Sequence, residues 1–322
     1  MTARRRIVSL VVLTALAAAL VAGVAVVATD GGSATTRGLP EPRPGRPPLS
    51  YALGFRADAE ARDLERAAEL YARGRGVEAA EVFTRYDSLD AKVGAAFARW
   101  PEDTYDRLEQ LGKLYPDSAV VQLHLGLARL WANRGDPSEA WRATVESEPD
   151  TPYAILAGNL LHPHLPRGLP TFIPSFDAPA DVVRLPRSRQ LEALRRRAET
   201  GSVRDLLLYG IGLQRTGRPV SAASAFDRAA AAAPADVEAQ VAGAVGRFDK
   251  DAPEEAFGRL GPLTRRFPNE PTVRFHLGVL LLWSGRIEGA ERQFRLASRT
   301  KPGSPLAREA ARYLRTITGA RS

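Results

Sequence analysis

The sequence predicts an all-α protein in which helices stack in pairs behind a single apolar helix at the N-terminus. Small, aromatic and proline residues recur every 34 positions in the C-terminal third of the chain. The composition is rich in alanine, leucine and arginine, which lose little conformational freedom in a helix. An uncharged run at residues 7–29 is long enough to cross a bilayer.

The composition excludes several kinds of chemistry. The 322-residue chain has no cysteine, which rules out disulfides, thiolate metal sites and cysteine nucleophiles. Its formal charge is +8, but residues 1–50 carry six arginines against two acids, so the remaining chain is only mildly basic. We therefore expect no nucleic-acid binding, which requires a concentrated basic surface.

The N-terminal apolar run follows Arg4, Arg5 and Arg6. Flanking arginines stay cytoplasmic, so we expect the C-terminal domain to be extracytoplasmic. Residues 1–29 are predicted to be an uncleaved signal-anchor that crosses the plasma membrane once through residues 7–28. The alternative is a cleaved signal peptide, although its apolar region normally spans only about 7–15 residues. Residues 30–57, rich in proline and glycine, are predicted to be an extended linker.

Residues 203–304 contain three units of equal length. A small residue occurs where two helices are expected to cross, an aromatic or leucine fills the gap beside it, and a proline ends the second helix. The recurring residues are Gly210, Ala244 and Gly278; Ala222, Ala256 and Ala290; Phe226, Leu260 and Phe294; and Pro234, Pro268 and Pro302.

This pattern resembles the tetratricopeptide repeat. The last unit matches it at Leu277, Gly278, Leu281, Gly285, Ala290, Phe294, Ala297 and Pro302. The resemblance implies a right-handed α-solenoid of helix hairpins. A single hairpin cannot bury its own apolar face, so the hairpins must stack.

The pattern continues upstream in degenerate form. Leu123-His124-Leu125-Gly126 parallels Phe275-His276-Leu277-Gly278 at an offset of 152 residues. We therefore expect tetratricopeptide-like hairpins over residues 58–148 and, after the last repeat, a capping helix over residues 305–322. The equivalent positions of His124 and His276 favour a structural role at a helix surface.

Residues 149–202 interrupt the period with a proline-rich insertion and an arginine-rich helix from about residue 187 to 199. Eight prolines between residues 149 and 187 exclude a long helix there. The run 169–176 is too apolar for a free linker, so we expect it to pack over the solenoid. The insertion is either a joint between two repeat arrays or a functional loop on a rigid scaffold.

No motif predicts an enzyme, a cofactor or a metal site. His162 and His164 are the only local histidine pair, whereas a zinc site needs three or four ligands. The sequence contains no phosphate-binding loop and no familiar nucleophile motif.

In tetratricopeptide proteins the first helices of successive pairs line a concave groove that binds a peptide. Arg204 and Arg215 are predicted to clamp a peptide carboxylate and Trp283 to be an aromatic anchor. Alternatively, Trp283 and Phe275 pack on the capping helix. By position in the repeat, the predicted partner-binding residues are Arg204, Leu207, Ile211, Gln214, Arg215, Val241, Val245, Phe248, Phe275, Val279 and Trp283, with Glu238, Asp249 and Leu282 beside them.

The sequence thus predicts a membrane-tethered scaffold or adaptor that binds a protein or peptide partner at the outer face of a bacterial plasma membrane. One alternative is a protein that binds an anionic cell-wall polymer or lipid headgroups through the arginine cluster at residues 184–197. A second is an enzyme that uses His162 or His164 in the loop at residues 150–180.

Overall fold

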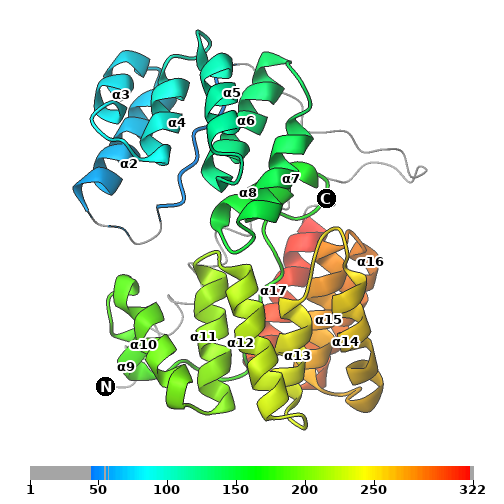
Figure 1. Ribbon diagram of the computed structural model, residues 1–322. Helices are drawn as coiled ribbons and strands as arrows, with labels where there is room; N and C mark the ends of the chain where they lie inside the picture. The colour runs from blue at the N-terminus through cyan, green and yellow to red at the C-terminus, as the bar shows by residue number, and fades with distance from the viewer. Residues whose placement is uncertain (1–44, 54–55, 57, 320–322) are drawn as a thin grey trace.

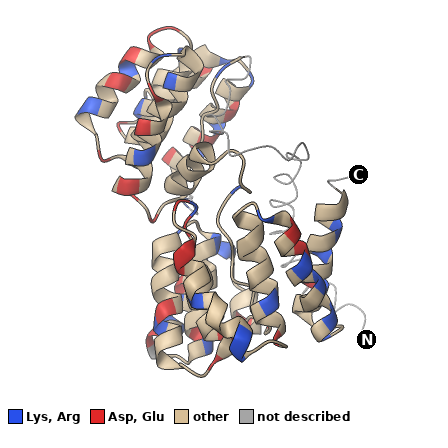
Figure 2. Cartoon of the chain, turned by 90° about the vertical axis from the view of Figure 1, so that its right-hand side faces the viewer, with Lys and Arg blue, Asp and Glu red and all other residues tan. Residues whose placement is uncertain are grey.

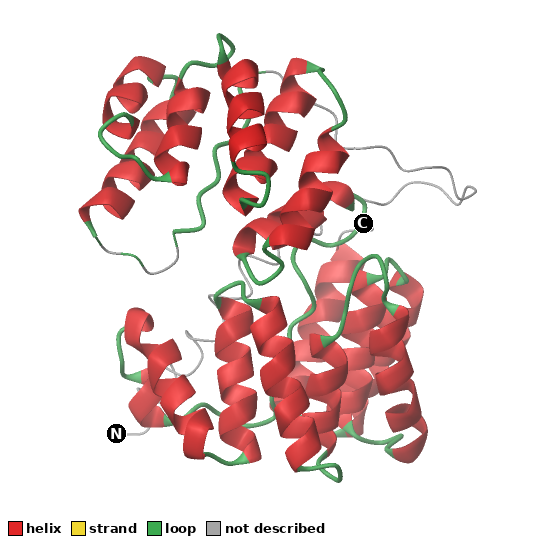
Figure 3. Ribbon diagram, viewed as in Figure 1, coloured by secondary structure: helices red, strands yellow, loops and turns green. Residues whose placement is uncertain are grey.

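The computed structural model describes residues 45–53, 56 and 58–319, and these ranges contain sixteen helices and no strand (Figures 1 and 3). The predicted all-α class is confirmed. The predicted anchor at residues 1–29 lies outside the described residues, as does most of the linker. Within the described ranges, no helix combines the length and the apolar character needed to cross a membrane.

The first seven of these helices form one unit, which we call the first array, in the upper half of Figure 1. They are α2 (Ala59–Ala72), α3 (Gly76–Phe83), α4 (Leu89–Ala98), α5 (Thr104–Leu114), α6 (Ala119–Ala132), α7 (Pro137–Ser147) and α8 (Pro152–Leu161). Their buried side chains form one apolar core.

The remaining helices form the second array, in the lower half of Figure 1. They are α9 (Ala180–Val183), α10 (Arg187–Thr200), α11 (Val203–Arg215), α12 (Pro219–Ala232), α13 (Val237–Gly246), α14 (Glu254–Arg266), α15 (Pro271–Trp283), α16 (Ile287–Thr300) and α17 (Pro305–Gly319). Their apolar core is separate from that of the first array.

Helices pack in consecutive pairs in both arrays. In the second array the pairs are α11 with α12, α13 with α14, and α15 with α16. Gly217 and Gly285 form the turns in the outer two pairs, each with φ of +71°. This left-handed conformation favours glycine, as the turn positions of the repeat predict.

The small residues lie where the two helices of a pair cross. A Cβ added to Gly210 would lie 2.4 Å from Cε1 of Phe226, and one added to Gly278 would lie 2.8 Å from Cδ1 of Phe294. In the first array, a Cβ at Gly126 would lie 2.2 Å from Nε1 of Trp141. The aromatic ring therefore occupies the space that the glycine leaves.

Prolines end the second helices as predicted. Helices α12, α14 and α16 end at Ala232, Arg266 and Thr300, each two residues before Pro234, Pro268 or Pro302. Proline disfavours helical backbone in the residue before it. Each array then closes on a last helix: α8 packs on α6 and α7, and α17 packs on α15 and α16.

The substitution Gly210→Ala should destabilise the second array. The added methyl group overlaps the ring of Phe226, and overpacking of this kind costs about 1–3 kcal/mol. Gly258→Ala in α14 is the matched control, because a Cβ there meets nothing within 4 Å. The control should gain up to about 1 kcal/mol from helix propensity. Urea unfolding followed by circular dichroism measures both, and equal shifts of the two midpoints would contradict the assigned crossing.

Candidate functional site

Residues 169–177, which we call the second strap, cross three first helices of the second array without forming a helix. Three side chains, one from each helix, accept hydrogen bonds from its backbone. The N–H of Phe172 donates to Oε1 of Gln214 on α11 (3.0 Å). The N–H of Ser175 donates to Oε1 of Glu238 on α13 (2.7 Å), and that of Ile173 to Nε2 of His276 on α15 (3.0 Å).

The side chain of Phe172 anchors the second strap. It is only 1 % exposed and belongs to the apolar core of the array. Its ring stacks on His276 with centroids 5.0 Å apart and meets the ring of Phe226 edge-on at 5.7 Å. Main-chain hydrogen bonds thus fix the backbone, and one aromatic pocket selects a side chain.

Helix α11 fixes the direction of the second strap. Near its C-terminal end, Nε2 of Gln214 donates to the carbonyl of Pro170 (3.4 Å). At its N-terminal end, Arg204 donates to the carbonyl of Asp177 (2.8 Å) and lies 4.4 Å above the ring of Phe176. The strap therefore runs antiparallel to α11.

His276 is a neutral hydrogen-bond acceptor. Its Nδ1 lies 2.7 Å from the carbonyl oxygen of Thr272, which can only accept, so Nδ1 carries the proton. Nε2 is left with a lone pair for the N–H of Ile173. Burial lowers the pKa of His276 to about 4, so the ring is neutral at neutral pH.

The first array repeats this device. Residues 46–53, the first strap, place the N–H of Ser50 3.1 Å from Nε2 of His124, whose Nδ1 faces the carbonyl of Val120 at 2.7 Å. The ring of Tyr51 lies near those of His124 (6.3 Å) and Phe83 (6.1 Å). Burial lowers the pKa of His124 to about 4 as well.

The expectation that His124 and His276 lie at a helix surface was wrong. Both are completely buried, because each must reach a backbone N–H beneath its strap. The side chains of His276 and Phe172 hold the second strap, and the sequence interpretation did not include them among the candidate binding residues. Two signals pointed to them: the shared offset of the two histidines and the apolar run at residues 169–176.

The predicted partner-binding residues separate into two groups. Gln214 is half-buried, and Arg204 and Arg215 are exposed. The other eight are buried in the core beside or beneath the second strap: Leu207, Ile211, Val241, Val245, Phe248, Phe275, Val279 and Trp283. They belong to the same apolar core as Phe172 and present almost no surface to a ligand.

The structure does not bring Arg204 and Arg215 together. They lie eleven residues apart on α11, about 17 Å at 1.5 Å per residue, and Arg204 holds the second strap. Trp283 is 2 % exposed and so is not a surface anchor. Phe275 packs on Tyr313 of α17 with centroids 5.7 Å apart, as the alternative interpretation expected.

The arginine cluster at residues 184–197 is partly neutralised within the chain. Arg195 pairs with Glu192 and Glu199, Arg196 with Glu192, and Arg197 with Asp181 and Asp205. Basic and acidic residues are interspersed over the helices of both arrays (Figure 2). Among the described residues, only Arg184, Arg187 and Arg189 of the cluster form no salt bridge.

The histidine pair in the insertion lies beside an acidic residue of the second array. The ring centroids of His162 and His164 are 6.2 Å apart, and Nε2 of His162 lies 3.1 Å from Oδ1 of Asp251. In the part of the chain that the structure describes, no three His, Asp or Glu side chains are placed to hold a metal ion.

Neither the comparison with protein-family models nor the comparison with curated proteins finds a match for this chain. The second strap and the helices that hold it define the candidate site.

Acidification should destabilise the fold through the two histidines. The pKa of each is about 4 when folded and about 6.5 when unfolded, so the unfolded chain binds more protons between these values. The free energy of unfolding has its full value above pH 6.5 and falls as the pH decreases towards 4. Between pH 6.5 and 5, each histidine should lower the free energy of unfolding by about 2 kcal/mol.

The control for this effect is His276→Gln, which has no titrating group at that position. Urea unfolding at pH 7 and pH 5 should show that this variant loses about 2 kcal/mol less than the unmodified chain over the interval. The same loss in both proteins would show that His276 is not held neutral by the fold.

Proposed function

We propose that this chain is a tetratricopeptide-like scaffold that binds an extended segment of a partner protein across the first helices of its hairpins. The hairpins would wind as a right-handed solenoid, and the chain would be tethered at the outer face of a plasma membrane. In this role the protein is an adaptor without catalytic activity of its own.

The observation that carries the proposal is the second strap. Three helices each contribute one acceptor, Gln214, Glu238 or His276, to a backbone N–H of an extended polypeptide. Any peptide backbone offers the same N–H groups. A face that holds a segment of its own chain in this way is chemically suited to hold an equivalent segment from a partner.

The local features of the hairpins support the tetratricopeptide-like assignment. The turn glycines, the glycine–aromatic crossings and the prolines after the second helices all lie where that repeat places them. The buried residues that were predicted to bind a partner then form the floor of the site, and the strap covers that floor.

A partner segment competes with the second strap in this proposal. Its sequence needs an aromatic residue to replace Phe172 between His276 and Phe226, because an empty pocket there would cost several kcal/mol of packing. The strap is covalently attached and has a high effective concentration, so it raises the affinity that a partner must reach. Ser175 and Asp177 are exposed, which makes that end of the strap the place where exchange begins.

Vacating the site should create a peptide-binding protein. We expect a variant with residues 170–176 replaced by glycine and serine to bind a fluorescent peptide of sequence 168–178, measured by fluorescence anisotropy. The unmodified chain should bind it much more weakly, because its own strap occupies the site. A peptide with alanine in place of Phe172 should bind at least about tenfold more weakly, since a buried aromatic contributes more than 1.4 kcal/mol.

Two further proteins make this test decisive. Phe172→Ala keeps the backbone of the strap, so it should accept the same peptide with intermediate affinity. Adding Gln214→Ala to the vacated variant should weaken the peptide, because Gln214 contacts the strap twice. A vacated variant that retains its helical circular dichroism but shows no saturable binding contradicts the proposal.

The membrane tether has its own test. The full chain expressed in bacteria should sediment with membranes and resist extraction at alkaline pH, because residues 7–28 are uncharged and long enough to span a bilayer. A chain that begins at residue 30 should remain in the soluble fraction. Added protease should digest the C-terminal domain of the full chain in spheroplasts, and protection there would reverse the proposed orientation.

A further inference from the structure

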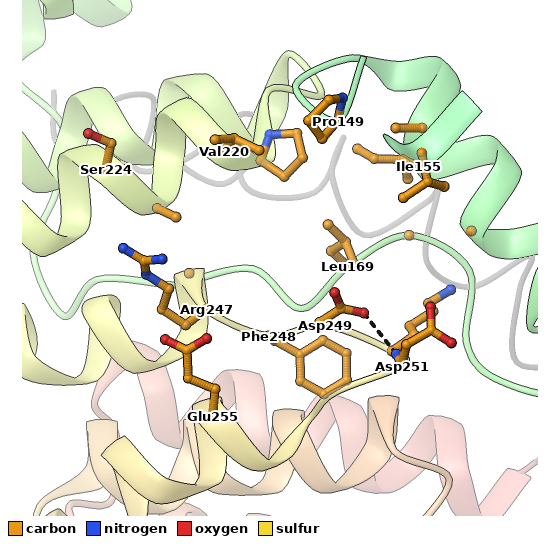
Figure 4. A pocket seen from close by; sticks show the side chains of 18 of the residues that line it. Pro149, Ile155, Leu169, Val220, Ser224, Arg247, Phe248, Asp249, Asp251 and Glu255 are labelled. Atoms are coloured by element: carbon orange, nitrogen blue, oxygen red, sulfur yellow. Dashed lines mark hydrogen bonds between the residues drawn. The ribbon is translucent and has the colours of Figure 1, made fainter. Parts of the chain in front are cut away.

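A pocket of about 660 Å³ lies where the two arrays meet. Helix α8 and the chain before it form one wall, helix α12 forms the second, and residues 246–251 with Leu169 form the floor (Figure 4). Its volume is within the range of about 300–1,000 Å³ that is typical of ligand sites, which often occur between structural units.

Contacts between the arrays hold the walls in place. Asp150, just before α8, accepts a hydrogen bond from the N–H of Ser221 in the first turn of α12 (2.9 Å). On the opposite side, Nζ of Lys250 donates to Oδ1 of Asn159 on α8 (2.9 Å), which also accepts from the N–H of Gly168 (2.7 Å). The pocket is therefore preformed.

The middle of the pocket is apolar. Val220 and Ile155 lie on one side of it, Phe248 lies opposite, and Leu169 lies between them (Figure 4). Val220 is 51 % exposed, and among the described residues only three other branched aliphatic side chains, those of Val77, Leu114 and Leu296, are exposed. An apolar ligand would cover this side chain.

One end of the pocket carries excess positive charge. The guanidinium of Arg247 is fixed by Asp227, to which its Nε donates at 2.8 Å. Arg259, which lies outside the lining, also pairs with Asp227 (2.8 Å) and with Glu255 (3.2 Å), so Arg247 and Arg259 together balance these two carboxylates. Arg228 forms no salt bridge with any described residue. This end of the pocket therefore has one positive charge that no acidic side chain balances.

The opposite end carries excess negative charge. Asp249 and Asp251 line it, Oδ1 of Asp249 accepts the N–H of Asp251 (2.8 Å), and Oδ1 of Asp251 lies 3.1 Å from Nε2 of His162. Lys250 between them directs its Nζ to Asn159, and burial lowers the pKa of Lys250 to about 8. In Figure 4 Asp251 lies on the far side of Phe248 from Arg247, and Asp249 lies beside the ring of Phe248.

We propose that this pocket binds a short apolar peptide in its zwitterionic form, with the ammonium group at Asp249 and Asp251 and the carboxylate at Arg228 and Arg247. Its apolar side chains lie over Val220 and Ile155. An anionic amphiphile would leave Asp249 without a cationic partner, and a cationic one would leave Arg228 without an anionic partner. Binding in this pocket does not require exchange of the second strap, whose first residue, Leu169, lines the pocket.

The test uses the full chain in lipid nanodiscs and three probes: trileucine, N-acetyl-trileucine and trileucine amide. Isothermal titration calorimetry should show saturable binding of trileucine, and blocking either end should weaken it at least tenfold. Equal affinity for the three probes, or no heat with millimolar trileucine, overturns the proposal.

Variants then locate the site. Gly158 lines the pocket and a Cβ there meets nothing within 4 Å, so Gly158→Leu should fill the pocket and abolish binding without disturbing α8. Gly258→Leu, equally open but on α14 outside the lining, is the matched control and should bind like the unmodified chain. Binding to Gly158→Leu at the original affinity places the ligand elsewhere and rejects this pocket.

Charge variants assign the two ends. The Arg228→Gln variant should bind trileucine and trileucine amide with nearly equal affinity. It should still bind trileucine more tightly than N-acetyl-trileucine. Asp249→Asn should show the opposite pattern. If neither discrimination changes, the two ends do not recognise the charges of the ligand and the proposed orientation is wrong.

Discussion

The structure depends on a backbone N–H that donates to a buried, neutral histidine. Ile173 donates to His276 in the second array, and Ser50 donates to His124 in the first. The apolar faces of the first helices need a cover, and a covering polypeptide brings polar N–H groups that must be satisfied when buried. A histidine held as one tautomer by a carbonyl of its own helix supplies that acceptor without adding a charge.

The two arrays share one plan: a strap, a series of helix pairs and a closing helix. This plan separates the tasks of the residues. Glycines and aromatics at the crossings set the spacing within a pair, while Gln214, Glu238 and His276 face the strap. Because the arrays have separate cores and meet through polar contacts such as that of Asp150 with Ser221, a pocket remains between them.

The hairpins could be predicted from sequence because their determinants are local. A turn glycine such as Gly217 and a proline such as Pro268 act within a few residues of themselves, so their spacing reveals the boundaries. The strap contacts could not be predicted, since the hydrogen bond between Ile173 and His276 joins residues 103 positions apart. The same limit applies to Val241 and Val279, which were expected to line an open groove but are buried: the apolar run at residues 169–176 predicted packing on the solenoid, but not which helices it would contact.

The first strap has a mechanical consequence. In a chain held by an N-terminal anchor, tension on the tether reaches residues 46–53 before it reaches α2. The pull then loads several bonds together, including those from Ser50 to His124, from Ala52 to Tyr153 and from Tyr71 to Pro47. These contacts belong to α6, α8 and α2, so force is shared among three helices of the array and is not borne by its first helix alone.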